Sequence, residues 1–420
     1  MKWWPRPRVS TTAPVADRAG EHVAYLDWLK FLVVYGIVIY HVALPFSATS
    51  WLINSHDRNL VLSAFTGFTF PWGIPLMFLL SGAGAYFGLR RKSASAFFVL
   101  RVVRLGLPLV AGLLILSPLQ SYFISGGSWR TWYGLLVYYP RFLGSVRIDW
   151  EPLWLGHYGY QLWFLGYLLA ISVATLPLLE WLRRDTGRRW VARAASFSHK
   201  RGGLLVFVVP LVLSQLWLRN RYPNYEDWAD IATYAIVFVA GFIMAADRDF
   251  DLAIRKNAGL MLRFGIVSTL AVGALVVINY QHLIKNDPLS HLAFHFAFGL
   301  FWSLNIWSWC VAVLYLGVRW LNSRNALVRY GAESALPVYV ISHPVVIIAG
   351  SFIVFWSLPL YARFAILLIT AFAGTLCIYE FGVRRWNPTR FVFGLKPLSK
   401  KSEPEKASTS NTVGANAPVG

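Results

Sequence analysis

Charged residues and cysteines are scarce in this chain of 420 residues. Only 14% of the residues are charged, whereas 57% are hydrophobic and 20 are tryptophan. A soluble globular chain has about 25% charged residues, so this composition excludes that class and indicates a protein whose surface faces lipid. The two cysteines, Cys310 and Cys377, both fall within long apolar runs, which excludes a disulfide framework and a cysteine-rich metal site.

Ten apolar runs are long enough, or nearly so, to cross a bilayer as helices, which takes about 17 to 25 residues each. They predict an all-α, polytopic membrane helix bundle of about ten transmembrane helices. The runs are residues 28–46, 65–89, 105–124, 160–182, 203–218, 231–246, 260–280, 292–316, 335–355 and 364–381. We therefore expect one transmembrane domain, 25–397, between an N-terminal tail, 1–24, and a disordered polar tail, 398–420.

The net charge of +20 at first suggests a polyanionic partner such as nucleic acid. If residue 1 is cytoplasmic, however, most of the 39 lysines and arginines fall in segments that face the cytoplasm. The positive-inside rule then explains the basic balance and predicts that both termini are cytoplasmic. No surplus of positive charge remains that would require nucleic acid.

Lys30 and His41 stand inside the first apolar run, where an ionisable side chain is costly. An unpaired charge near the centre of a membrane helix costs about 2.5 to 3.5 kcal/mol, so such residues usually face a cavity and act there. Eleven residues of helix separate the two, which is three turns and about 16 Å, so both project from nearly the same face. Two interpretations stay open: a chemical role for both, or a lysine that reaches the membrane surface and a histidine that bonds a neighbour.

Arg101 and Arg104 lie one turn apart before the third span, and two guanidinium groups so placed suit a phosphate-bearing cytosolic ligand. Basic residues that flank a span also orient it in the membrane, and the spacing alone does not decide between these roles. In the ninth span, Glu333 at the inner boundary is followed by His343 near the middle of the membrane. An imidazole beside Pro344 either bonds the carbonyl that the proline ring frees or takes part in chemistry.

Five segments resemble, in the expected order, the motifs of membrane acyltransferase family 3, and the resemblance runs from about residue 22 to 397. The segments are Lys30 and His41 with ten residues between them, Ser81 with Gly82, Arg101 with Arg104, Trp163 to Leu165, and Tyr339 with His343. Within the family, the surroundings of His343 and the ending Phe393 to Pro397 are similar to the subgroup that succinylates periplasmic glucans. Ser342 stands where that subgroup tends to have a second histidine.

The resemblance implies a membrane-embedded O-acyltransferase of a bacterial inner membrane. Such an enzyme moves an acetyl or succinyl group from cytosolic acyl-CoA to a hydroxyl of an extracytoplasmic, periplasmic glycan. We accordingly expect acyl-CoA as a co-substrate, a glycan acceptor and a surrounding lipid bilayer. We expect no bound cofactor, no metal and no nucleic acid.

Nine residues are candidates for this site, in three groups. They are the catalytic candidates His41, Asp27 and His343, the donor-binding candidates Lys30, Arg101 and Arg104, and the substrate-binding candidates Ser81, Trp163 and Glu333. An imidazole is suited to take a hydroxyl proton near neutral pH, so His41 is the candidate general base, with Asp27 or His343 as its partner. An acyl-histidine intermediate is the other mechanism left open.

Two other functions compete with acyl transfer. A transporter or flippase for a glycan or lipid-linked intermediate would use the intramembrane ionisable residues as a polar pathway, but no inverted repeat is visible in the sequence. A haem-bearing electron carrier would use His41 and His343 as axial ligands.

Overall fold

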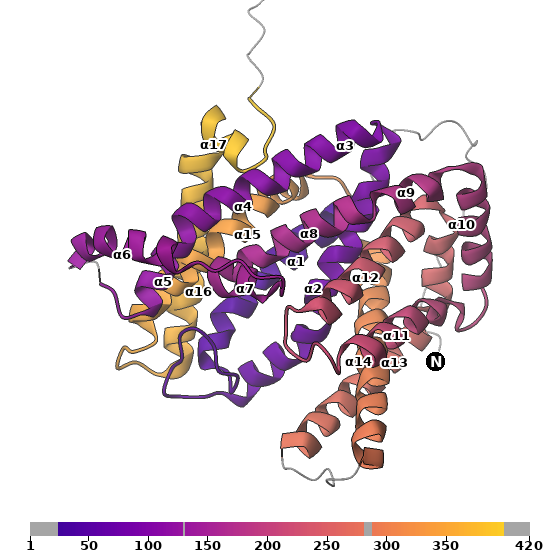
Figure 1. Cartoon of the computed structure of the whole chain (residues 1–420), viewed down its shortest axis with the longest axis horizontal. Helices are drawn as coiled ribbons and strands as arrows, with labels where there is room; N and C mark the ends of the chain where they lie inside the picture. Colours follow the sequence, from indigo (N-terminus) through magenta and orange to yellow (C-terminus); the bar gives the residue numbers. More distant parts are fainter. Residues whose placement is uncertain (1–23, 129–130, 281–287, 399–420) are drawn as a thin grey trace, which may run out of the picture.

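The computed structural model describes residues 24–128, 131–280 and 288–398, and these ranges contain helices and no strand (Figure 1). The N-terminal tail up to residue 23 and the polar tail from residue 399 lie outside the described residues. The principal helices are α1 (Ala24–Ala43), α2 (Leu60–Arg90), α3 (Ala94–Arg101), α4 (Leu107–Ala111), α5 (Ser117–Ile124), α6 (Trp132–Ser145), α7 (Leu153–Gly159), α8 (Trp163–Ala174), α9 (Leu176–Arg183), α10 (Asp185–Ser198), α11 (Val208–Leu218), α12 (Trp228–Ala246), α13 (Asp249–Tyr280), α14 (Pro288–Trp320), α15 (Ala326–Ile353), α16 (Leu360–Cys377) and α17 (Asn387–Val392). Short 3-10 helices are η1 (Leu44–Phe46), η5 (Tyr160–Leu162) and η6 (Gly203–Phe207), and π-helical turns are η2 (Val102–Gly106), η3 (Gly112–Leu116) and η7 (Ile378–Val383).

The described part of the chain contains eight helical stretches that are long and apolar enough to cross a membrane. They are Ala24–Phe46, Leu60–Arg90, Ala94–Ile124, Trp228–Ala246, Asp249–Asn279, Leu289–Trp320, Ala326–Ile353 and Leu360–Val383. The pair α8 and α9, bent by 50°, makes a ninth if it is one span, and Gly203–Leu218 is a shorter apolar helix. The predicted polytopic helical bundle is confirmed, and the described residues contain eight candidate spans, or nine with the bent pair, where about ten were expected.

Two predicted spans, 160–182 and 203–218, differ from the structure for local reasons. Pro177 lies at the start of α9, where its ring disfavours helical backbone for the preceding residue, and the Thr175 hydroxyl donates to the carbonyl of Ile171 at 2.7 Å as α8 ends. The other predicted span follows Gly202, whose φ of 79° breaks the helix before it. Sixteen helical residues rise about 24 Å, which is less than a hydrocarbon core of about 30 Å.

The helices α1 and α15 pack side by side and run in the same direction. The Tyr35 hydroxyl of α1 shares a hydrogen bond of 3.0 Å with the Ser334 hydroxyl of α15. One turn earlier, Gly331 lies so close to the ring of Phe31 that a larger side chain would overlap it. We name the end of the bundle where both helices begin the Lys30 end, and the opposite end, which carries the loop 47–59, the Trp51 end.

Two glycines let the backbones of α2 and α12 touch. A Cβ atom at Gly82 would overlap the carbonyl oxygen of Phe238, and one at Gly241 would overlap that of Leu79. Small residues at such crossings allow close van der Waals packing, the main source of helix association in lipid. Elsewhere, α13 and α14 lie against each other and project beyond the other helices at the lower edge of Figure 1.

We expect Gly82→Ala to lower the free energy of unfolding by about 1 to 3 kcal/mol, because the added methyl group meets backbone that cannot rotate away. Gly67→Ala, on the same helix, is the matched control, since no atom lies within 4 Å of its added Cβ. Alanine is the better helix former, so the control should unfold at the same or a slightly higher midpoint. The measurement is unfolding of the purified protein in detergent, and equal midpoints for the two variants would contradict a stabilising role for the close crossing of α2 and α12.

Candidate functional site

A cavity of about 330 Å³ lies at the Lys30 end between α1, α2, α3, η2, α8 and α15. Four of the predicted site residues line it: Lys30, Ser81, Arg101 and Arg104. Apart from these polar groups its wall is largely apolar, and the described residues that line it include no carboxylate. Three cations line this space and no carboxylate stands in its wall, although Asp27 interacts with Lys30 from one turn earlier on α1, so the cavity is an environment suited to a phosphate or another anion. We call it the cation-lined cavity.

The three cations come from different helices. The Lys30 amine lies against Gly84 of α2, where a Cβ would be 3.3 Å from Nζ. The Arg101 guanidinium donates to the backbone carbonyl of Ser81 at 3.4 Å and lies 5.0 Å from the ring centroid of Phe97. These contacts fix the direction of the Arg101 side chain, so the charge is already placed before any ligand arrives.

The side chain of Arg104 is held in place by Gly394, which lies in the segment after α17. Its Nε atom donates to the carbonyl of Gly394 at 3.0 Å, and the residue lies in the π-helical turn η2, a feature often found at functional sites. Gly394 has a φ of 64°, and a Cβ there would lie 2.8 Å from the carbonyl oxygen of Arg104. Only glycine therefore combines this left-handed backbone with so close an approach.

His41, which is half-buried, and His343, which is buried, form a pair closer to the Trp51 end. Their ring centroids are 4.7 Å apart with the planes at 88°, so the edge of one ring meets the other. At this separation no space remains between them for a haem and its iron. Trp51, from the loop that follows α1, stacks parallel to His41 at 6.0 Å and meets His343 edge-on at 5.5 Å. Trp51 was not predicted, because a loop tryptophan carries no local signal.

Gln120 of α5 determines the proton position on His343. The Gln120 amide nitrogen donates to the carbonyl of Leu116 at 3.2 Å, which turns its oxygen toward His343 Nδ1 at 2.6 Å. An amide oxygen only accepts, so Nδ1 carries the proton and Nε2 of the neutral ring is free to accept one. The Nδ1 atom of His41 is buried and has no hydrogen-bond partner within the described residues. Sequence reasoning missed Gln120, although a polar amide inside an apolar run is itself a signal.

Backbone strain occurs next to this pair. Tyr160 has a φ of 51°, which an L-residue other than asparagine or aspartate rarely adopts, and its ring centroid lies 6.3 Å from that of His343. The next residue, Gln161, accepts a hydrogen bond from the Tyr339 hydroxyl and donates to the carbonyl of Val340 at 3.0 Å. These bonds hold the strained turn against α15, and such strain is often found where a site requires a fixed geometry.

The cation-lined cavity and the histidine pair are consecutive along α1 and α15. The cavity lining ends at Val34 on α1 and at Tyr339 on α15. His41 follows Val34 by seven residues and His343 follows Tyr339 by four, which is a rise of about 10 Å and 6 Å. The same two helices therefore carry the cation-lined cavity toward one end and the histidine pair toward the other.

The structure separates Asp27 from His41. Asp27 lies near the start of α1, fourteen residues and about 21 Å before His41, whereas His343 contacts the His41 ring directly. Of the two partners considered from the sequence, the geometry brings His343 to His41 and leaves Asp27 at the Lys30 end.

Two predicted substrate contacts lie away from the cation-lined cavity. Trp163 is buried in an aromatic cluster, with its ring 5.1 Å from that of Tyr167. Glu333 forms an ion pair of 2.8 Å with Arg390 of α17. Neither residue lines the cavity, so Ser81 is the one member of that predicted group that does.

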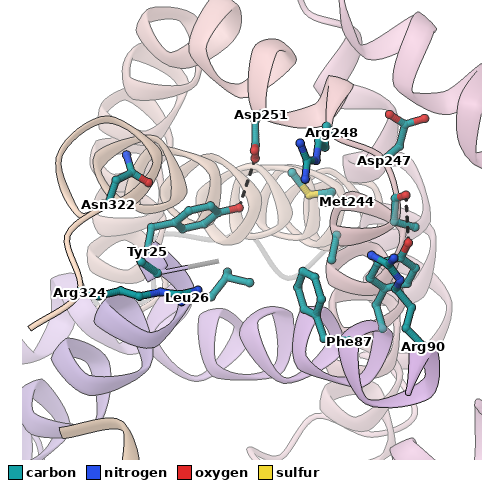
Figure 2. A pocket seen from close by; sticks show the side chains of 14 residues that line it. Tyr25, Leu26, Phe87, Arg90, Met244, Asp247, Arg248, Asp251, Asn322 and Arg324 are labelled. Carbon is teal, nitrogen blue, oxygen red and sulfur yellow. Dashed lines mark hydrogen bonds between the residues drawn. The ribbon is translucent and has the colours of Figure 1, made fainter. Parts of the chain in front are cut away.

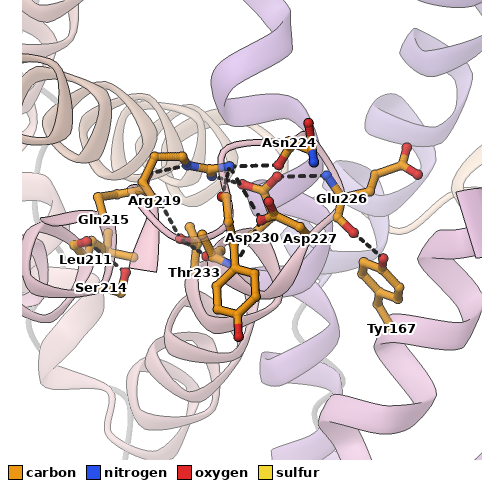
Figure 3. Close-up of polar contacts among 12 residues, drawn as sticks. Tyr167, Leu211, Ser214, Gln215, Arg219, Asn224, Glu226, Asp227, Asp230 and Thr233 are labelled. Carbon is orange, nitrogen blue, oxygen red and sulfur yellow. Dashed lines mark hydrogen bonds and ion pairs between the residues drawn. The ribbon is translucent and has the colours of Figure 1, made fainter. Parts of the chain in front are cut away.

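A polar cluster surrounds the start of α12 (Figure 3). Arg219 forms ion pairs with Asp230 and, at 3.6 Å, with Asp227. Glu226 has a φ of 66°, its N–H donates to Asp230 at 2.9 Å, and its carbonyl accepts a bond from Tyr167. Burial, and then the charge of Asp230, raise the pKa of the Glu226 carboxyl to about 8. Burial raises the pKa of Asp227 to about 6, against the lowering effect of Arg219.

Comparison with known proteins gives one family and a set of named relatives. The model of an acyltransferase domain, family 3, matches residues 23–380. Proteins named Glucans biosynthesis protein C from Salmonella paratyphi A, Salmonella agona and Salmonella dublin are each 24% identical over 388 residues, covering 90% of this chain and 96% of theirs. No solved structure matches the chain.

The raised pKa of Glu226 predicts a pH dependence of stability. Folded Glu226 keeps its proton up to about pH 8, while the ordinary pKa is 4.5, so between these values the folded state binds more protons than the unfolded state. Stability from this group therefore falls as the pH rises from about 4.5 to 8. In Glu226→Gln we expect a flatter dependence of the unfolding midpoint over this range. Glu151→Gln, at an exposed position, is the control, and parallel curves for wild type and Glu226→Gln would contradict the prediction.

Proposed function

Because the chain belongs to membrane acyltransferase family 3, we propose that it transfers an acetyl or succinyl group from a cytosolic acyl-CoA to a hydroxyl of a periplasmic glycan. The observation that carries the proposal is the arrangement on α1 and α15, where the histidine pair follows the cation-lined cavity. In this proposal the Lys30 end faces the cytosol and the Trp51 end faces the periplasm of a bacterial inner membrane. The positive-inside rule supports that orientation.

The cation-lined cavity holds part of the donor. Lys30, Arg101 and Arg104 supply fixed positive charge for a phosphate of the acyl-CoA, and the apolar wall suits the aliphatic part of its pantetheine arm. Further along, the arm directs the thioester toward the histidine pair. Because the arginines are held by Ser81 and Gly394, little side-chain ordering is left to occur on binding.

The histidine pair activates the acceptor. His41 takes the proton of the acceptor hydroxyl, the oxygen attacks the thioester carbonyl, and the thiolate of CoA leaves. His343, held by Gln120 with its proton on Nδ1 and with its ring 4.7 Å from that of His41, is the neutral ring next to the imidazolium that forms at His41. A direct attack of His41 on the thioester, with an acyl-histidine intermediate, uses the same geometry.

A glycan acceptor is supported by the relatives and by Trp51. The relatives carry glucans in their name, and their similarity covers 90% of this chain. Trp51 is half-buried beside both imidazoles, and an aromatic ring at that place offers an apolar face to the C–H groups of a sugar. The acceptor hydroxyl then lies next to the base.

The proposal is tested by transfer of label to the envelope glycan fraction from radiolabelled acetyl-CoA and, in parallel, succinyl-CoA. Membranes contain the wild type, His41→Ala or the control His56→Ala, whose histidine is exposed in the loop 47–59. We expect His41→Ala to lose about 10²- to 10⁴-fold in rate, the usual contribution of a general base, and His56→Ala to keep the wild-type rate. The donor that gives label identifies the acyl group. Equal label with His41→Ala and wild type would refute the assigned role and favour transport instead.

Gln120 should act as a positioning residue. Gln120→Leu removes the acceptor for the Nδ1 proton of His343, so the ring can turn or change tautomer. We expect kcat to fall about 10- to 100-fold with the donor KM unchanged, since breaking one buried hydrogen bond costs about 1 to 3 kcal/mol. Gln120→Glu keeps an accepting oxygen and should retain most of kcat. A wild-type kcat in Gln120→Leu would exclude this role for the amide.

A further inference from the structure

A second cavity, of about 690 Å³, lies at the Lys30 end on the other side of the α1–α2 contact (Figure 2). It is bounded by the start of α1, the end of α2, the junction of α12 and α13, and the segment after α14. The lining residues that matter here are Tyr25, Tyr86, Arg90, Arg248, Asp251 and Arg324. None of them belongs to the predicted site, and we call this space the arginine–tyrosine cavity.

The volume of the arginine–tyrosine cavity is the first reason to assign a ligand to it. Pockets for drug-sized ligands have volumes of about 300 to 1,000 Å³, so the cation-lined cavity, at about 330 Å³, is at the small end. An acyl-CoA combines a nucleotide with a long arm and is larger than a typical drug. The donor therefore needs additional space at the same end of the bundle, and the arginine–tyrosine cavity has about twice the volume.

The two cavities are neighbours along α1. Leu26 lines the arginine–tyrosine cavity and Lys30 lines the cation-lined cavity, and the two residues lie four apart on one face, a rise of about 6 Å. On α2, Phe87 faces the first cavity while Gly84 and Gly88 face the second. Both cavities thus lie at the same end of the bundle, against the same two helices.

The chemistry of the lining suits a nucleotide. Arg90, Arg248 and Arg324 carry planar guanidinium groups that match phosphate oxygens. Tyr25 and Tyr86 present aromatic rings on which a base can stack, and the Arg90 guanidinium lies 5.8 Å from the centroid of the Tyr86 ring. Arginines together with aromatic rings favour a nucleotide over a ligand that is only an anion.

Two carboxylates also line the arginine–tyrosine cavity, and both are engaged. Asp251 accepts a bond from the Tyr25 hydroxyl at 3.2 Å and so fixes the direction of that ring (Figure 2). Asp247 accepts from the N–H of Asp249 at 3.0 Å at the start of α13. Carboxylates repel the phosphates of a lipid and of a nucleotide alike, but they also accept bonds from a ribose hydroxyl and from the amino group of a base. The mixture of arginines and carboxylates therefore suits a nucleotide better than a headgroup that offers only a phosphate.

We propose that the arginine–tyrosine cavity binds the nucleotide part of the acyl-CoA donor, while Lys30, Arg101 and Arg104 hold the phosphate that joins its pantetheine arm, with the arm itself in the cation-lined cavity. The inference rests on the proposed function for the identity of the donor. It adds a second donor subsite with its own residues, and it predicts that loss of these residues weakens binding of the nucleotide and not of the arm.

The test measures equilibrium binding of radiolabelled coenzyme A and of 4′-phosphopantetheine, which lacks the nucleotide, to the full chain purified in detergent. We expect the wild type to bind coenzyme A more tightly than phosphopantetheine. In Arg248→Ala, and separately in Arg90→Ala, the Kd for coenzyme A should rise about tenfold, the effect of one lost charge-assisted contact, while the Kd for phosphopantetheine stays the same. Both arginines are exposed, so the variants should fold, and Arg193→Ala, an exposed arginine of α10, is the matched control.

Three outcomes would overturn the proposal. One is a wild type that binds the two compounds equally, and another is a variant that keeps the full preference for coenzyme A. The third is displacement of neither compound by adenosine 3′,5′-bisphosphate together with binding of phosphatidylglycerol that depends on Arg248, which would assign the cavity to a lipid headgroup. Binding is measured without turnover, so a chain that binds coenzyme A through Arg248 but transfers no acyl group would refute the proposed function and leave this subsite standing.

Discussion

The parallel contact between α1 and α15 is the constraint on which the site depends. Tyr35 and Ser334 hold the two helices in register with a hydrogen bond of 3.0 Å, and Gly331 leaves room for the ring of Phe31. With this register His41 meets His343, and both helices also contribute to the wall of the cation-lined cavity. A shift of one residue would rotate a helix by about 100° and separate the imidazoles. The packing of α1 against α15 therefore determines whether the histidine pair forms.

Polar contacts of buried residues fix both ends of that helix pair. At the Lys30 end the short helix α17 is held by the ion pair between Arg390 and Glu333, which brings Gly394 to Arg104. At the Trp51 end Arg363 is buried and bonds the carbonyl of Val354 at 2.6 Å, while its ion pair with Asp57 ties down the loop that carries Trp51. Buried charges are costly unless they are paired, so these contacts tie each segment to a defined place. Glu333, a predicted substrate contact, is engaged by Arg390 in this structure.

The sequence predicted the elements of this fold better than their contacts. Apolar runs identify the membrane helices because lipid requires long uninterrupted helices, and they fail only for the stretch at 203–218, which is too short, and at the bend before Pro177. The spacing of Lys30 and His41 on one face follows from helix geometry and is independent of tertiary structure. The choice of His343 over Asp27 as the neighbour of His41 needs the register of α1 against α15, which no local pattern encodes. The contacts of Gln120 and Trp51 with the histidines could not be predicted for the same reason, because each residue comes from another segment of the chain.

The distance between the two parts of the site has a consequence for how the proposed reaction must proceed. The cation-lined cavity ends at Tyr339, whose hydroxyl is bonded to the carbonyl of Gln161, and His343 lies one turn beyond. In the proposed reaction, phosphate groups held at the arginines stay at the Lys30 end, so the arm of the donor, and not its nucleotide, has to bring the thioester past Tyr339 to the histidines. The acceptor would approach the same histidines from the side of Trp51. A donor and an acceptor from opposite compartments would then meet at one imidazole pair, and neither the nucleotide nor the glycan would have to cross the membrane.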